Sequence, residues 1–366
     1  MSTGPIKFME NALKECVTIP FEDYEEKVSG IMDTFGFVVV TGILSPEECV
    51  NAEVLMKTDL VNCIDETVKV DNVLKQAITN VKNSSKHWPR ASTPGLPDKG
   101  FMSTNGIPQG NFAWEMRTNP KVREIFAHLH TTQEIVVGID VSFFSADGID
   151  APTTVMWPHA DQDSRLNYGS EHSYQGILYA WDATTSDKST TVVWPKSHVN
   201  EYENLKNAIP ISNGKHGLNI TNIHVASIQA EFMKRWLNGA RRVQVPAGGL
   251  IIFNSRTIHQ GYASGYRLAQ PISWAPKACR SELALKQKLQ TLHMGIATTH
   301  WAELGIHHVV SFKKNKKPKS DPDHNKCIFS MKRIPSVPVK NLILNLKNAS
   351  LQDLKNSVKP EYIDFI

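Results

Sequence analysis

The stretch "VPAGGLIIFNSRTIHQGYASGYRLAQPISWAP" (residues 245–276) decides the fold predicted for this chain. It contains three short runs rich in β-branched and aromatic residues: "GGLIIFN" (248–254), "TIHQGYA" (257–263) and "RLAQPISWAP" (267–276). Runs of this composition, bounded by glycine, proline, serine and asparagine, are typical of strands. Only a few turn-forming residues separate them. Strands that follow one another without helices between them indicate antiparallel pairing.

The same pattern begins near residue 134 and gives five further strand-like segments. They are "EIVVGIDVSFF", "TTVMW", "YQGILYAWDA", "STTVVWP" and "RRVQVP". Eight such segments favour an antiparallel sandwich or barrel over alternating β–α units. We therefore predict a mainly β fold with flanking helices, a double-stranded β-helix of the jelly-roll, cupin-like barrel type. An insertion at 199–240 interrupts the series, and its "SIQAEFMKRWLNG" is expected to form a helix that Gly239 ends.

Three regions are expected along the chain, as parts or extensions of one domain. Residues 1–130 form a helical region with one strand, "FGFVVVTGIL", directly followed by a helix with Ser45 as its N-cap. Residues 131–280 form the jelly-roll core. Residues 281–366 form a helical extension that contains a basic loop at 312–320.

Composition indicates a globular protein and excludes several classes. The chain has 366 residues, 41% of them hydrophobic, and a formal net charge of only +4. No apolar stretch approaches the roughly 20 residues that a membrane-spanning helix needs, and no secretory signal is recognisable. The five cysteines form no CxxC pair and are odd in number, which indicates reduced thiols. An intracellular, cytoplasmic protein is expected, and the Lys-rich segment 313–319 leaves a nuclear location open.

Candidate metal ligands occur in "VMWPHADQDSR" (155–165) and in the opening stretch. A His-x-Asp triplet by itself is close to uninformative. Here it follows a predicted strand. Residues two apart on a strand point to the same face, so His159 and Asp161 could bind one ion. His259, near the start of another strand, is the candidate third ligand. Two histidines and one carboxylate form the facial triad of non-haem Fe(II) oxygenases, whereas zinc favours a more closed set.

Arg267 follows His259 by eight residues and lies on the last predicted strand. A buried guanidinium is costly unless it holds an anion, and its planar fork suits a carboxylate. The distal carboxylate of 2-oxoglutarate would fit, and the alternative is an ion pair with an acid of the protein. Among the tryptophans, Trp157 is the candidate for the wall of the active site because it stands beside His159.

An ordered series of segments resembles the phytanoyl-CoA dioxygenase-like family of Fe(II)/2-oxoglutarate-dependent oxygenases. The series is "GFVVVTGILSPEEC", "WEMRTNPKVREIF", "WPHADQ", "YQGILYAWDA", "VVWPKSH", "GGLIIFNSRTIH" and "YRLAQPISWAP", with "ATTHW" (297–301) after it. No single piece is specific, but the order and spacing over residues 30–305 are. The resemblance implies that His159, Asp161 and His259 bind iron and that Arg267 binds the far carboxylate of 2-oxoglutarate. It also makes Gln175 a weaker candidate for the cosubstrate pocket.

The resemblance implies an enzyme that uses Fe(II), 2-oxoglutarate and O2, releases succinate and CO2, and hydroxylates or oxidises a small molecule. Asp161 argues against a halogenase, because halogenases replace this carboxylate by a small residue. Three departures from the family pattern stand out. Ala269 occupies a position where the family often has a hydroxyl residue, Gly249 replaces an acidic residue, and "PKSH" (195–198) replaces "PGSH". The first implies that one hydrogen bond to 2-oxoglutarate is missing or comes from elsewhere.

The sequence also permits other interpretations. A non-catalytic jelly-roll binding or scaffold protein that retains a metal site is the second functional hypothesis. A second metal site is considered where His293 and His300 lie seven residues apart and where His307 and His308 precede Cys327. The substrate is unidentified, with a slight preference for an anionic substrate or partner from the basic loop, whose contact with nucleic acid is considered but not supported further. Residues 84–111 and 199–240 are the expected pocket walls.

Overall fold

The structure is a computed structural model, in which the chain forms two facing β-sheets surrounded by helices. It describes residues 6–63, 100–103, 106–145, 155, 157–166, 172–211, 217–262, 265–305 and 337–366. The basic loop at 312–320 and most of the predicted strand "TTVMW" lie outside these residues. No helix in the described ranges has the length and apolar character that crossing a membrane requires.

The larger sheet has seven strands in the described part of the chain. Their order is β1 (Thr18–Pro20), β2 (Phe37–Thr41), β11 (Leu250–Asn254), β7 (Tyr174–Tyr179), β13 (Arg267–Ile272), β5 (Ser142–Ser145) and β3 (Phe101–Met102). All neighbours pair antiparallel except β1 and β2, which are parallel. The predicted antiparallel arrangement is therefore found, and the predicted N-terminal strand is an integral member of this sheet.

The smaller sheet carries five strands among the described residues. Their order is β10 (Arg241–Arg242), β8 (Thr191–Val193), β12 (His259–Gly261), β6 (His159–Ala160) and β9 (Leu218–Asn219). A separate two-stranded ladder joins β4 (Ile135–Val137) to β14 (Trp274–Pro276). Neighbouring strands of the smaller sheet come from distant parts of the chain, which is how residues far apart in sequence reach one site.

Alternating side chains divide the core into an inner and an outer layer. On β2, Phe37 and Val39 face a cluster that also contains Val193 of the smaller sheet, so the two sheets pack against each other. Val38 and Val40 face the opposite way, into the cluster beneath the helices. This period-two alternation is what a strand buried on both faces requires. The result is a jelly-roll core with flanking helices, as predicted.

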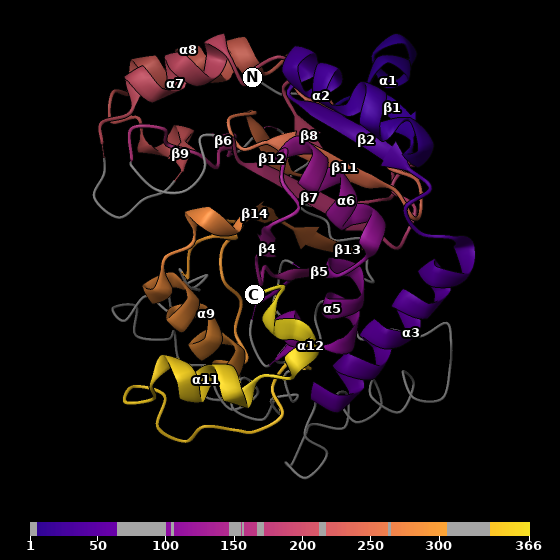
Figure 1. Ribbon diagram of the computed structural model, residues 1–366. Coiled ribbons are helices and arrows are strands. Elements are labelled where there is room, and N and C mark those ends of the chain that lie inside the picture. Colours follow the sequence, from indigo (N-terminus) through magenta and orange to yellow (C-terminus); the bar gives the residue numbers. More distant parts are fainter. Residues whose placement is uncertain are drawn as a thin grey trace, which may run out of the picture.

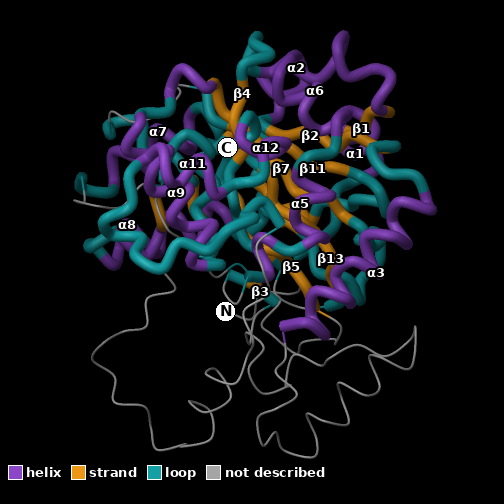
Figure 2. The backbone as a smooth tube through the Cα atoms, turned by 60° about the horizontal axis from the view of Figure 1, so that its bottom comes forward, coloured by secondary structure: helices purple, strands orange, loops and turns teal. Residues whose placement is uncertain are grey.

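Helices cover the outer faces of both sheets. The α-helices are α1 (Asn11–Val17), α2 (Tyr24–Phe35), α3 (Pro46–Cys63), α5 (Asn111–Arg117), α6 (Pro120–Leu129), α7 (Asn200–Ala208), α8 (Ala226–Trp236), α9 (Glu282–Met294), α11 (Leu351–Ser357) and α12 (Pro360–Ile363). Short 3-10 turns are η1 (Phe21–Asp23), η2 (Ile107–Gln109), η3 (Ile220–Asn222) and η4 (Lys277–Cys279). Figure 1 shows α7 and α8 above the smaller sheet and α9 beside α11. Figure 2 shows the strands in the middle of the molecule with helices around them.

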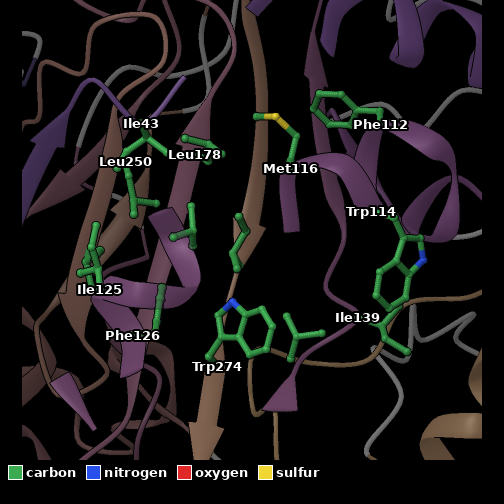
Figure 3. Packing of buried hydrophobic residues seen from close by; sticks show 14 of the residues in the cluster. Ile43, Phe112, Trp114, Met116, Ile125, Phe126, Ile139, Leu178, Leu250 and Trp274 are labelled. Carbon is green, nitrogen blue, oxygen red and sulfur yellow. The ribbon is translucent and has the colours of Figure 1, made fainter. Parts of the chain in front are cut away.

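The outer core lies between the larger sheet and helices α5 and α6. Leu178 and Leu250 of the sheet lie near Ile43, with Ile125 and Phe126 of α6 close by (Figure 3). Each of these side chains is essentially excluded from water. Burying one large apolar side chain contributes roughly 1.5–3 kcal/mol, so this layer is a main source of stability.

Capping chemistry defines several helix ends, and at Ser45 it confirms the predicted helix start. The Ser45 hydroxyl accepts from the Glu48 backbone N–H, and the Glu48 carboxylate accepts from the Ser45 N–H, which is a reciprocal capping box. Helix α2 ends at Phe35 and is capped by Gly36, whose φ of 81° favours glycine. The predicted helix in the insertion is α8, although it ends at Trp236, three residues before Gly239.

Candidate metal and cosubstrate site

Strand pairing brings two histidines from distant segments together. His159 of β6 and His259 of β12 are direct partners in the antiparallel register of the smaller sheet. Directly opposed residues of an antiparallel pair have their side chains on the same face. Asp161 follows β6 immediately and is buried. The predicted set of His159, Asp161 and His259 therefore meets at the inner face of the smaller sheet.

The three side chains are close enough to bind one ion. The Nε2 atom of His159 lies 3.4 Å from Oδ1 of Asp161, and Nε2 of His259 lies 3.3 Å from Oδ2. One potential ligand atom from each residue lies within 4.8 Å of the others, and this trio is the one group of metal-competent side chains found among the described residues. Two imidazoles and one carboxylate leave coordination positions open for other molecules.

Backbone hydrogen bonds aim both imidazoles at the same point. Nδ1 of His159 lies 3.1 Å from the Trp157 carbonyl oxygen, and Nδ1 of His259 lies 3.0 Å from that of Thr257. A carbonyl only accepts, so both Nδ1 atoms carry the proton and donate it. The Nε2 lone pairs then point toward Asp161. Three electron-rich groups converging without a donor between them fit a bound cation, and such backbone partners typically orient metal-binding histidines.

A third histidine lies at this cluster that the sequence interpretation had not placed there. Nε2 of His300 is 3.6 Å from Oδ1 of Asp161, and His300 lines the same cavity. The sequence feature that could have indicated this role of His300 is the "ATTHW" segment, which belongs to the series that resembles the family. His293, its suggested metal partner, instead forms a 2.7 Å hydrogen bond with Ser357. The histidines at 307 and 308 and Cys327 lie outside the described residues.

Electrostatics favour a single negative charge at the centre of this cluster. Burial works against ionisation of Asp161, but His300, His259 and His159 together hold the pKa of this carboxyl well below its usual value. Burial lowers the pKa of His159, with His259 adding to the effect. Burial also lowers the pKa of His259, but the Asp161 carboxylate raises it more. The pKa of His259 therefore lies above its usual value. A proton and a metal ion therefore compete for the Nε2 lone pair of His259.

Arg267 is buried on β13 and faces the same cavity. Its Nη2 donates a 2.9 Å hydrogen bond to the Tyr179 hydroxyl, and its guanidinium lies 4.0 Å from the centre of the Phe143 ring. No carboxylate in the described part of the chain forms an ion pair with it, and its buried Nε has no hydrogen-bond partner there. Burial lowers its pKa, and the interaction with Tyr179 offsets this effect only in part. Among the described residues, Arg267 therefore does not form the ion pair with a protein acid that was the alternative interpretation.

One cavity of about 230 Å³ connects these groups. Gln175 on β7 and Trp157, the two pocket candidates from the sequence, both line it, and the Trp157 ring stacks on that of His159 with centroids 4.9 Å apart. Thr191 lines it too and had not been singled out from the sequence. Its hydroxyl lies 3.3 Å from that of Tyr179.

The two predicted pocket walls differ in what they contribute. Phe101, from the 84–111 segment, lines the cavity, whereas 84–99 lie outside the described residues. None of the described residues of the 199–240 insertion lines it. The insertion instead provides β9, in which Asn219 is the register partner of His159. Its described part supports the position of a candidate ligand and does not wall the pocket.

Two imidazoles and a carboxylate at one point of the cavity match the ligand set of non-haem Fe(II) oxygenases, and an arginine without an acidic partner among the described residues lies at another point. The sequence model of the phytanoyl-CoA dioxygenase family matches residues 32–267. The match covers well over half of the chain, and the chain belongs to this family. It is therefore a 2-oxoglutarate-dependent non-haem iron enzyme whose cofactor is iron and whose cosubstrates are 2-oxoglutarate and O2.

Individual relatives are more distant. Ava biosynthesis cluster protein O of Aspergillus versicolor is 24% identical over 219 residues, which cover 56% of this chain and 68% of that protein. The non-haem α-ketoglutarate-dependent carbocyclase SnoK from nogalamycin biosynthesis is 12% identical, with 71% of this chain and 87% of SnoK covered and a TM-score of 0.45. HygX from Streptomyces hygroscopicus, solved with nickel, 2-oxoglutarate and hygromycin B, is 12% identical, with 69% and 87% covered and a TM-score of 0.41. The family assignment comes from the sequence model and not from these structural likenesses.

Proposed function

We propose that His159, Asp161 and His259 bind Fe(II), that Arg267 binds the distal carboxylate of 2-oxoglutarate, and that the protein hydroxylates a small molecule held in the remaining cavity. The observation that carries this proposal is the pair of fixed imidazoles. Both have Nδ1 committed to a backbone carbonyl and Nε2 turned toward a carboxylate that stays ionised. When bound, iron and 2-oxoglutarate supply the oxidising chemistry, with O2 consumed and succinate and CO2 released.

The cavity offers 2-oxoglutarate an anion site away from the metal ligands. Along β12, His259 pairs with Val193 and Gly261 pairs with Thr191, so the Thr191 side chain lies two strand positions from His259. Two positions correspond to roughly 6–7 Å along a strand. Arg267 faces the cavity, and its neighbour Tyr179 links it to Thr191. Apart from histidines, Arg267 is the only cationic residue among the described residues that line the cavity, and this supports its assignment to the far carboxylate of 2-oxoglutarate.

Hydroxyl groups complete this anion site in place of the residue that the family pattern would have at Ala269. The Tyr179 hydroxyl accepts from Arg267 and lies beside the Thr191 hydroxyl, which reaches the cavity wall. Because Tyr179 is already an acceptor for Arg267, its own O–H is free to donate. We assign Thr191 as the hydroxyl that contacts the carboxylate and Tyr179 as the residue that positions Thr191 and Arg267.

Apolar and aromatic side chains shape the rest of the cavity. Phe253 and Ile177 of the larger sheet lie opposite the metal ligands, with ring centroids of Phe253 and His259 4.5 Å apart. Phe101 and Trp157 add aromatic surface. These groups exclude water and strengthen electrostatic interactions at the ligands. They suit a substrate that presents a carbon–hydrogen surface, in agreement with a small molecule of low charge at its reacting end.

The test is aerobic turnover of 2-oxoglutarate with Fe(II), measured as succinate by chromatography, together with Mn(II) binding by electron paramagnetic resonance. Wild type is expected to bind one Mn(II) and to form succinate slowly even without its substrate. Asp161→Ala should abolish both. Asp182→Asn, which changes an acid that contacts Thr184 outside the cavity, is the matched control and should retain both. Equal succinate formation by wild type and Asp161→Ala would contradict the assignment.

A further inference from the structure

We propose that His300 is a positioning residue that holds one oxygen of the Asp161 carboxylate and so fixes how Asp161 presents itself to the metal. The inference rests on the proposed metal site. His300 lies outside the core strands, on a segment that follows helix α9.

The segment that carries His300 is anchored on its N-terminal side by hydrogen bonds to two other parts of the chain. Ala297 N–H donates to the Ser103 carbonyl at 2.9 Å, and Thr298 N–H donates to the Ile139 carbonyl at 2.7 Å. In return the Ile139 N–H donates to the Thr298 hydroxyl at 2.9 Å. Trp301, directly after His300, is buried. Residues 297–302 therefore form an anchored strap that holds His300 at the cavity.

Gly138 lies next to both Ser273 and the strap. A Cβ at Gly138 would meet the Ser273 hydroxyl at 2.7 Å and the Thr299 carbonyl oxygen at 3.4 Å. Gly138 also donates its N–H to the Ser273 carbonyl at 2.8 Å. The lack of a side chain at position 138 lets this backbone pack closely against Ser273, and residues 299–302 lie at van der Waals distance beside it.

The geometry at Asp161 separates His300 from the two metal-ligand candidates. Nε2 of His159 and Nε2 of His300 approach the same oxygen, Oδ1, at 3.4 and 3.6 Å, while His259 approaches Oδ2. His300 does not belong to the trio whose ligand atoms lie mutually within 4.8 Å. Its Nε2 is buried and has no hydrogen-bond partner within the described ranges. The 3.6 Å separation from Oδ1 is slightly longer than a hydrogen bond, and contacts at reactive sites often shorten when the site binds its ligands.

A donor at Oδ1 has a defined consequence for metal binding. A carboxylate has two oxygens and could chelate an ion with both, which would use up an open coordination position. An N–H from His300 occupies a lone pair of Oδ1 and restricts Asp161 to one-oxygen binding. Groups that orient a ligand in this way typically change metal affinity by about 10- to 100-fold when they are removed.

The experiment titrates apo-protein with Mn(II), followed by electron paramagnetic resonance, for wild type, His300→Phe, His300→Gln and His293→Gln. We expect His300→Phe to bind Mn(II) about 10-fold or more weakly, with a changed signal of the bound ion. His300→Gln, which keeps an N–H donor, should recover most of the affinity. His293→Gln is the matched control, because His293 is buried and hydrogen-bonded to Ser357 away from the cavity, and it should bind Mn(II) as wild type does.

Thermal unfolding of each apo-variant checks that the fold is retained, and His300→Gln provides the decisive comparison if His300→Phe does not fold. Unchanged Mn(II) affinity and signal in both His300 variants would overturn the inference. An equal loss of Mn(II) affinity in His300→Phe and His300→Gln would also overturn it. A wild-type protein that binds no Mn(II) would instead overturn the proposed metal site itself, so the two failures are distinguishable.

Discussion

The hydroxyl of Tyr179 accepts a 2.9 Å hydrogen bond from Nη2 of the buried Arg267. The two residues come from adjacent strands, β7 and β13, and the register partner of Tyr179 on β13 is Ala269. A small side chain at 269 leaves space for the Tyr179 ring between the sheets. Ala269, where the family often has a hydroxyl residue, thus lies opposite a tyrosine whose hydroxyl is 3.3 Å from that of Thr191.

Replacing Tyr179 by Phe should weaken 2-oxoglutarate binding without unfolding the protein. Hydrogen bonds to charged groups contribute about 1.5–3 kcal/mol, which corresponds to about 10-fold or more in Kd. Isothermal titration with the Mn(II)-loaded protein measures it. Tyr262→Phe is the matched control, because the Tyr262 ring also packs under an arginine, with the Arg242 guanidinium 3.6 Å from its centroid, and does not line the cavity. Equal affinities for all three proteins would remove Tyr179 from the anion site.

Thr191→Val should have a similar effect, and Ala269→Ser should reverse it. Valine keeps the shape of threonine but removes the hydroxyl at the cavity wall. A serine at 269 restores a hydroxyl two positions after Arg267, so Thr191→Val/Ala269→Ser is expected to bind 2-oxoglutarate more tightly than Thr191→Val alone. Thr190→Val is the control, since the Thr190 hydroxyl donates to the Val243 carbonyl and not to the cavity. The same titration reports all four proteins, and an unchanged Kd in Thr191→Val argues against its role.

Asp59 makes stability depend on pH in a direction unusual for an acid. Burial raises its pKa to about 6, although the Phe112 N–H and the Asn111 side-chain amide donate to it. The folded state thus holds the proton more tightly than the unfolded state. The stability linked to protonation is fully present below about pH 4 and is lost as the pH rises through about 6.

Urea unfolding of wild type and Asp59→Asn between pH 4 and 7.5 tests this linkage. The free energy of unfolding of Asp59→Asn relative to wild type should rise by up to about 3 kcal/mol across this range. The comparison between the two proteins cancels the other titrating groups. A difference that stays constant with pH would show that burial does not perturb Asp59.

Gly176 should not tolerate alanine, although it faces away from the cavity. A Cβ there would meet Phe126 at 3.2 Å and Leu250 at 3.1 Å within the outer core. Overpacking of this kind costs about 1–3 kcal/mol. Gly30→Ala is the control, because nothing lies within 4 Å of its Cβ position in α2, and it should stabilise by about 0.5–1 kcal/mol. Urea unfolding measures both, and an equally stable Gly176→Ala would contradict the packing argument.

Several elements could be predicted because their signals are local. The reciprocal cap at Ser45 and Glu48 depends on residues three apart. Strand segments depend on β-branched composition between turn residues. The end of α8 was predicted less well, because Gly239 follows a turn after Trp236 and does not itself end the helix.

The candidate ligands His159, Asp161 and His259 were also predicted, but from a different kind of signal. Their residue types and their order along the chain matched a known pattern. Thr191 and Tyr179 were missed because a hydroxyl residue on a strand carries no local mark of its function. His300 was missed because its segment lies after the core strands, and only packing against Ile139 and Ser103 brings it over the cavity.

The sequence by itself therefore determined the strands and helices, the antiparallel class and the residue types available for metal and anion binding, since neighbouring residues encode these features. The tertiary structure decided which of those residues meet. It made His159 and His259 register partners, left Arg267 without an acid among the described residues, and set His300 beside Asp161. These contacts join segments separated by about a hundred residues or more, and their proximity depends on sheet register and packing that no local pattern records.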